Sequence, residues 1–304
     1  QVAELAEKSN VETMKRFNER PGTVSNQYLH DLYRFFKLSV RKSEFRDIFK
    51  EKLDLHHVPA LDNILYWEDV LFPIADFYLA KERWDEAIEI YEELESIGGF
   101  EGESAEYYQK FGYALQKRKK YAEAIQAYLK ADTLKPDNIW NNRHLAICYR
   151  LNRNYQAALT YYKKVEEAAP EDTNVTFYIG SCLAELGQYE EALNYFFKLD
   201  FIDNNCIKAW RGIGWCSFIN QKHEQAMKYY EKIIEQKPLA IDYMNAGHVA
   251  WVMGDIQKAA VFYGKAITAS GNRERFLEMF HKDEESLLTQ GIREEDIPLM
   301  LDLL

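Results

Sequence analysis

Three of the four cysteines recur at one spacing, which makes them the first candidates for metal or redox chemistry. Cys148, Cys182 and Cys216 are each 34 residues apart, and Cys206 lies outside this series. A zinc site of the common kind needs ligands two to four residues apart, and no two cysteines are that close. Packed helix axes lie about 8–10 Å apart, which exceeds the Cα separation of about 7 Å that a disulfide tolerates. We predict buried free thiols that serve packing, and free thiols fit a reducing compartment such as the cytoplasm.

Acid–base and phosphate chemistry find no support in the remaining motifs. His56 and His57 precede Pro59 and have no acidic or cysteine partner at ligand spacing, so we interpret them as part of a turn. There is no GxSxG, no Walker loop and no HExxH motif, and Gly212–Gly214 lacks the third glycine of a dinucleotide-binding turn. The sequence therefore predicts no catalytic residue, no metal site and no cofactor.

Composition and charge narrow the class of partner. The chain is 47% hydrophobic and 14% aromatic, which is ample for burial and argues against disorder. The formal net charge of −11 makes the molecule as a whole repel nucleic acid and anionic membranes. No run of 18 apolar residues occurs, so we expect no transmembrane span.

The elements that position these residues follow from a repeat between Glu68 and Ser270. Each unit contains an alanine followed four residues later by an aromatic residue. The pairs are Ala87/Tyr91, Ala124/Tyr128, Ala158/Tyr162, Ala192/Phe196, Ala226/Tyr230 and Ala259/Tyr263. Three successive intervals between the alanines are 34 residues, the last is 33 and the first is 37. A period near 34 predicts a solenoid of helix–turn–helix units.

The second unit carries the fullest set of repeat residues. These are Tyr108, Phe111-Gly112, Leu115, Ala124, Tyr128, Ala131 and Pro136. The pattern resembles the tetratricopeptide repeat (TPR), and residues 31–49 resemble the segment that precedes the repeats in uncharacterised bacterial TPR proteins. The resemblance implies an all-α, right-handed α-solenoid of about six TPR units between helical N- and C-terminal caps.

The predicted domain boundaries follow the repeat period. The N-terminal helical cap is 1–67, with one or two degenerate repeats as the alternative for this segment, and the C-terminal helical cap is 271–304, because the end units of a solenoid need an atypical outer face. The array is 68–270, and its six units are 68–104, 105–138, 139–172, 173–206, 207–239 and 240–270. Gly98–Gly102 is expected to form a longer loop between the first two units.

The resemblance implies that the first helix of each unit lines a concave groove and that the acidic second helices face outward. The implied groove residues are basic and aromatic. They are Lys110, Tyr113, Lys117, Trp140, Arg143, His144, Tyr178, Lys208, Arg211, Trp215, Asn245 and His248, with Gln109, Arg150, Phe177 and Met244 at further inner positions. A positive, aromatic groove in an acidic chain predicts an extended acidic or carboxylate-bearing peptide as ligand. The alternative is that these side chains pair with one another, or with Glu103, Glu106 and Glu185, and bind nothing.

The carboxylate clamp found in some TPR proteins is incomplete here. Arg211 and Asn245 stand at two clamp positions, but Trp215 replaces the first Asn and no third repeat follows. We therefore predict a non-catalytic protein- or peptide-binding scaffold that does not bind nucleic acid. A regulatory or sensor module of a larger multidomain protein is the alternative, and an enzyme with an unrecognised site is a third possibility. The oligomeric state stays open.

Overall fold

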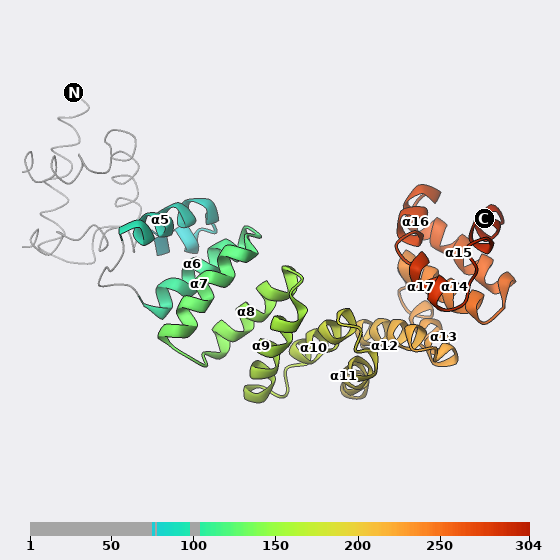
Figure 1. Ribbon diagram of the computed structural model, residues 1–304, viewed down its shortest axis with the longest axis horizontal. Coiled ribbons are helices and arrows are strands. Elements are labelled where there is room, and N and C mark those ends of the chain that lie inside the picture. Colours follow the sequence, from blue (N-terminus) through green and yellow to red (C-terminus); the bar gives the residue numbers. More distant parts are fainter. Residues whose placement is uncertain (1–74, 77, 98–103) are drawn as a thin grey trace, which may run out of the picture. The chain divides into compact units, whose positions relative to one another are not determined.

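The computed structural model describes residues 75–76, 78–97 and 104–304 (Figure 1). Every regular element among these residues is a helix. The helices are α5 (Trp84–Ile97), α6 (Ala105–Lys117), α7 (Tyr121–Leu134), α8 (Ile139–Leu151), α9 (Tyr155–Ala168), α10 (Thr173–Glu185), α11 (Tyr189–Ile202), α12 (Ile207–Ile219), α13 (His223–Ile234), α14 (Ala240–Val252), α15 (Ile256–Ser270), α16 (Arg273–Phe280), α17 (Glu284–Thr289) and α18 (Asp296–Asp302). The predicted N-terminal cap, His56-His57 and the loop Gly98–Gly102 lie outside the described residues.

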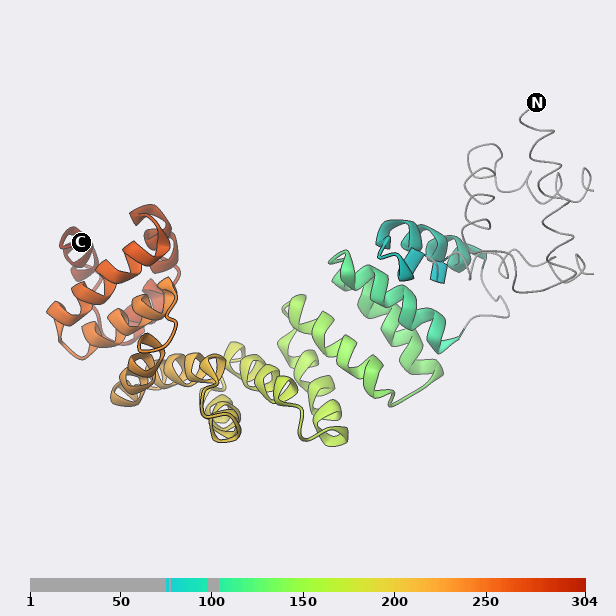
Figure 2. The same ribbon diagram turned by 180° about the vertical axis from the view of Figure 1, so that it is seen from behind.

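The contacts divide the chain into two compact units, each larger than a single repeat. The first unit is Gln1–His144 and the second unit is Leu145–Leu304. In the first unit α6 packs against α7, and in the second unit the pairs are α10 with α11, α12 with α13 and α14 with α15. Figure 2 shows the same pairs from behind, each joined by a short turn. The predicted all-α solenoid of TPR-type helix pairs is confirmed.

The turns between the two helices of each pair share one backbone feature. Each turn has a residue with positive φ just before the second helix. These residues are Glu82, Lys119, Arg153, Gly187, Gln221 and Gly254. Lys119, Arg153 and Gly187 are 34 residues apart, so the left-handed conformation repeats with the sequence period. Side chains other than Gly, Asn and Asp adopt this conformation at a cost, which the packing of the paired helices has to offset.

A small residue on the first helix meets the repeated aromatic residue on the second. A Cβ added to Gly112 would lie 2.8 Å from the Tyr128 ring, and one added to Gly214 would lie 2.9 Å from the Tyr230 ring. At Gly247 the corresponding distance to Tyr263 is only 2.5 Å. The aromatic rings thus fill the space that the missing side chains leave.

Replacing Gly247 with Ala is expected to lower the free energy of unfolding by about 1–3 kcal/mol, because the new methyl group overlaps the buried Tyr263 ring. Gly264 is the matched control, since it lies in α15 and has nothing within 4 Å of an added Cβ. Gly264→Ala should raise the free energy of unfolding by about 0.5–1 kcal/mol, since Ala favours the helix. Urea denaturation followed by circular dichroism measures both. Equal effects of the two substitutions would contradict the packing argument.

The cysteine series forms part of the core. Cys148, Cys182, Cys206 and Cys216 are all buried and free, which confirms the packing prediction. Burial raises the pKa of Cys148 and of Cys216 to about 12, so these thiols stay protonated at neutral pH. A protonated, buried thiol is a poor nucleophile and a poor metal ligand.

The C-terminal segment folds back onto the repeats of the second unit. Gln290 donates from Nε2 to the Ile219 carbonyl at 3.1 Å, and its Oε1 lies 2.9 Å from His223 Nε2. Phe276, Phe280 and Leu287 are fully buried in the same core as the repeats. The segment consists of the three short helices α16, α17 and α18.

Candidate functional site

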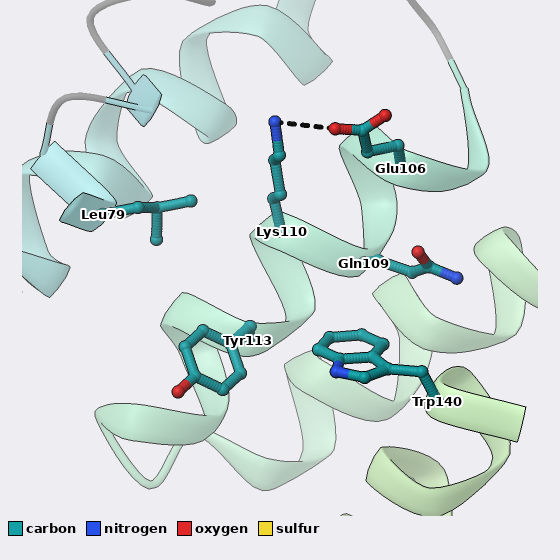
Figure 3. Close-up of a pocket in the computed structure, with 6 residues that line it drawn as sticks. All are labelled: Leu79, Glu106, Gln109, Lys110, Tyr113 and Trp140. Atoms are coloured by element: carbon teal, nitrogen blue, oxygen red, sulfur yellow. Dashed lines mark ion pairs between the residues drawn. The ribbon is translucent and has the colours of Figure 1, made fainter.

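A pocket in the first unit gathers several of the predicted groove residues. It has a volume of about 220 Å³ and is lined by Leu79, Glu106, Gln109, Lys110, Tyr113 and Trp140. Figure 3 shows Leu79, Tyr113 and Trp140 around the pocket, and Lys110 extending toward Glu106. α6 supplies four of these residues because its face repeats at intervals of three and four, and Trp140 comes from the first turn of α8.

Lys110 is already paired with acidic side chains. Its Nζ lies 2.9 Å from Asp76 Oδ2 and 2.9 Å from Glu106 Oε1. Asp76 lies three residues before the pocket residue Leu79, and Glu106 lies in the first turn of α6 and lines the pocket itself. Lys110 thus lies at the predicted groove position, but its charge is compensated within the unit.

The aromatic part of this surface is a connected cluster of rings. Tyr113 and Trp140 have ring centroids 6.1 Å apart, and the Trp140 and His144 centroids are 4.0 Å apart. Lys117 Nζ lies 5.0 Å from the Tyr113 ring centroid, a cation–π contact. His144 Nδ1 is 2.8 Å from Gln116 Oε1. Arg143, on the same helix, is partly exposed. The first unit therefore brings together five of the groove residues that the sequence assigned to it, Lys110, Tyr113, Lys117, Trp140 and His144.

Two histidines at groove positions titrate below their ordinary range. Burial, with positive charge from Arg143 and Lys117, lowers the pKa of His144 to about 4. In the second unit, burial lowers the pKa of His248 despite the nearby Asp283 carboxylate. Both side chains are therefore neutral in the folded protein at pH 7.

Stability should fall on acidification through these histidines. Unfolded histidine has a pKa of about 6.5, so between about pH 6.5 and pH 4 the unfolded chain binds more protons than the folded one. The stabilisation is complete above pH 6.5, and we expect a loss on the order of 2 kcal/mol by pH 4.5. Urea denaturation at a series of pH values measures this. In the double variant His144→Gln, His248→Gln the slope over this range should flatten, and an unchanged slope would contradict the assignment.

The second unit carries a separate cationic and aromatic surface on its first helices. The Arg150 guanidinium carbon lies 4.4 Å from the Tyr178 ring centroid, and Lys208 Nζ lies 5.1 Å from that of Phe177. Lys208 also donates to Asn174 Oδ1 at 3.0 Å. Across residues 145–304, all of which are described, neither cation forms an ion pair. We call Arg150, Asn174, Phe177, Tyr178 and Lys208 the α10 surface.

Arg211 forms an ion pair with Asp242 within the second unit. Its Nε and Nη2 donate to the two carboxylate oxygens of Asp242, each at 2.7 Å. The Asp242 side chain is 1% exposed and also accepts from the Leu239 backbone amide at 2.7 Å. The pair raises the pKa of Arg211 further and ties α12 to the start of α14. Trp215, one turn further along α12, is partly buried against Phe218.

The last repeat departs from the groove prediction. His248 and Met244 are fully buried, so neither is positioned to touch a ligand. His248 Nδ1 lies 2.8 Å from the Tyr263 hydroxyl, and its ring packs against Phe280 of α16. The C-terminal segment covers His248 and accounts for this correction. Asn245 remains partly exposed, although its Oδ1 is buried without a hydrogen-bond partner.

Sequence reasoning named Glu106 as an alternative partner for the groove cations, and Lys110 does pair with it, but it missed Asp76 and Asp242. Asp242 is 31 residues from Arg211, so it falls outside the repeat register that guided the prediction. Its signal was its place in the first turn of α14, where a carboxylate caps the helix. Leu79 and Asp76 lie in the predicted repeat unit 68–104, in which the sequence assigned no inner-face residue.

Two general features complete the description of the site. Among the described residues, His, Cys, Asp and Glu side chains form no group of three arranged to hold a metal ion. None of the helices in the described part of the chain is both long enough and apolar enough to cross a membrane.

Models of the tetratricopeptide repeat match residues 150–216, 105–138, 207–238 and 71–97. Comparison with curated protein sequences gives no match. Among solved structures, a tetratricopeptide repeat protein from Parabacteroides merdae is similar, with a TM-score of 0.54, 18% identity, and coverage of 77% of this chain and 97% of that one.

Two further solved structures are also similar. The TPR protein YrrB has a TM-score of 0.50 at 22% identity and covers 64% of this chain and 96% of its own. MamA from Desulfovibrio magneticus has a TM-score of 0.52 at 18% identity, and the match covers 55% of this chain and 96% of the MamA chain. Likeness at this identity shows the fold alone. Together with the repeat models and the series of helix pairs, it shows that the chain is a tetratricopeptide repeat protein.

Proposed function

We propose that this protein is a non-catalytic scaffold that binds an extended acidic or carboxylate-bearing protein segment on its first helices. TPR repeats indicate a protein–protein interaction scaffold, and repeats of this family are generally non-catalytic. Beyond this general role, we propose that the ligand is acidic and that it binds on the first helices.

The observation that carries the proposal is the α10 surface. Arg150 and Lys208 each lie over an aromatic ring, and neither forms an ion pair within residues 145–304. Charge-assisted hydrogen bonds from a guanidinium or an ammonium to a carboxylate are about twice as strong as neutral ones. Holding the cations over Tyr178 and Phe177 restricts their side chains before the ligand arrives, which reduces the entropic cost of binding.

The net charge of −11 sets the conditions under which such a ligand binds. Charges on the rest of the molecule repel an acidic segment at long range. At 0.15 M salt the screening length is about 8 Å, so distant repulsion is largely lost while direct contacts at the α10 surface persist. Acidic ligands should therefore bind at physiological salt through short-range contacts and without strong electrostatic steering.

A peptide on this fold has a precedent among similar structures. YrrB is a TPR protein with an unusual peptide-binding site. Its likeness to this chain concerns the fold, so it supports a peptide as the kind of ligand and says nothing about which residues hold it.

Two fluorescein-labelled peptides test the charge preference. One alternates Glu with Leu over nine residues, and the other replaces every Glu with Gln, which keeps the shape and removes the charge. Fluorescence anisotropy at 0.15 M salt should give a dissociation constant at least about tenfold lower for the Glu peptide, corresponding to about 1.4 kcal/mol. Equal affinities, or tighter binding of the Gln peptide, would exclude an acidic ligand.

A further inference from the structure

The pocket of the first unit differs chemically from the α10 surface. We propose that this pocket (Leu79, Glu106, Gln109, Lys110, Tyr113 and Trp140) receives one large apolar side chain of the bound segment, of the size of leucine or phenylalanine. This inference rests on the proposed function, because the side chain belongs to a peptide ligand. It assigns to the first unit a preference that the charge of the α10 surface does not explain.

The pocket has the size of a single side chain. Its volume of about 220 Å³ is below the range of about 300–1,000 Å³ that is typical of sites for drug-sized ligands. An apolar cavity of about 150 Å³ binds benzene, so this pocket has room for a phenyl ring or a branched aliphatic chain. A longer part of the ligand has to remain outside.

The walls of the pocket are suited to an apolar occupant. The rings of Tyr113 and Trp140 and the side chain of Leu79 form much of its lining (Figure 3). Trp140 is 42% exposed, although it already contacts Tyr113 and His144. Covering exposed Trp and Tyr surface removes apolar area from water, and such residues are enriched among those that dominate binding energy at interfaces.

The charges around the pocket oppose an ionic occupant of either sign. Asp76 and Glu106 both pair with Lys110 Nζ, so a ligand carboxylate there would face two acidic groups and an ammonium that is already bound. Lys117 lies over the Tyr113 ring, where it would repel a ligand cation. These two lysines and two acidic residues sum to zero, which leaves apolar contact as the remaining source of affinity.

Selection from a phage-displayed library of random 12-residue peptides tests the proposal on the full chain. Peptides selected on the unmodified protein should share a Leu or aromatic residue at one aligned position, besides acidic residues. Leu79→Trp fills the pocket, and selection on this variant should lose the shared apolar residue while keeping the acidic ones. Leu129→Trp, on the second helix α7, is the matched control and should keep both.

Affinity measurements on one selected peptide complete the test. Replacing its shared apolar residue with Ala should weaken binding to the unmodified protein at least tenfold and should leave binding to Leu79→Trp unchanged. Thermal unfolding checks that Leu79→Trp is folded, and Trp140→Ala, which removes a wall of the pocket, is the second variant if it is not. A shared Lys, Arg, Asp or Glu that depends on Leu79, or no shared residue, would overturn this inference. Loss of acidic residues from every selection would instead overturn the proposed function.

Discussion

Replacing Arg211 with Met is expected to lower the free energy of unfolding by about 3 kcal/mol. Asp242 accepts two hydrogen bonds from this guanidinium, and its side chain is 1% exposed. Without Arg211 the carboxylate keeps only the Leu239 amide as a donor among the contacts described above. Removing one partner of a buried pair leaves an uncompensated charge, which costs about 3–5 kcal/mol. We expect the lower end because Arg211 itself is 34% exposed, so water reaches part of the gap.

Arg293 is the matched control for this prediction. It also makes a bidentate contact with a carboxylate, at 2.8 Å and 2.7 Å from Asp296, but its side chain is 68% exposed. Arg293→Met should therefore cost less than about 1 kcal/mol. The double variant Arg211→Met, Asp242→Asn should recover part of the loss, because the buried charge is gone. Chemical denaturation measures all three, and equal costs for the two arginines would contradict the role of burial.

Reversing the charge of Arg150 and Lys208 together is expected to weaken binding of the Glu-containing peptide at least 100-fold, about 2.7 kcal/mol. Each substitution removes a charge-assisted contact and places a like charge against the ligand. Both residues are only partly buried and form no ion pair in the described second unit, so the double variant Arg150→Glu, Lys208→Glu should keep its melting temperature. Fluorescence anisotropy and thermal unfolding give the two measurements.

The control for charge reversal uses the second helices of the same unit. Lys163 on α9 and Lys228 on α13 are exposed and, in this fully described unit, form no ion pair. The double variant Lys163→Glu, Lys228→Glu makes the same change in net charge. It should lower affinity by less than about threefold at 0.15 M salt, because screening removes most long-range effects. A loss equal to that of the first-helix variant would show that net charge, and not position, governs binding.

The fold could be predicted from the sequence because its packing is local and repeated. The Ala124/Tyr128 pair and the small residue Gly112 recur with one period, and the structure places that ring against that glycine. The positive φ of Lys119 and Arg153 could not be predicted from the sequence, because Lys and Arg do not favour the left-handed conformation. The tertiary packing of the paired helices imposes that conformation.

The site was less predictable because its details depend on residues outside the repeat. Arg211 sits at an inner position, as expected, but its partner Asp242 is set by the cap of α14 and not by the period. His248 occupies an inner register position and is nevertheless buried, because Phe280 and Asp283 of the C-terminal segment lie against it. A periodic pattern identifies which face a residue occupies, and it cannot show what non-repeating segments place on that face.

Photo-crosslinking tests most directly whether the first helices of the second unit hold an acidic segment. The Glu-containing peptide would carry one benzoylphenylalanine, and mass spectrometry would locate the crosslinks on the full chain. We predict crosslinks within Thr173–Glu185 and Ile207–Ile219, which are α10 and α12, and their loss in Arg150→Glu, Lys208→Glu. Crosslinks confined to the second helices α9, α11 and α13, or crosslinks that survive the charge reversal, would contradict the proposed function.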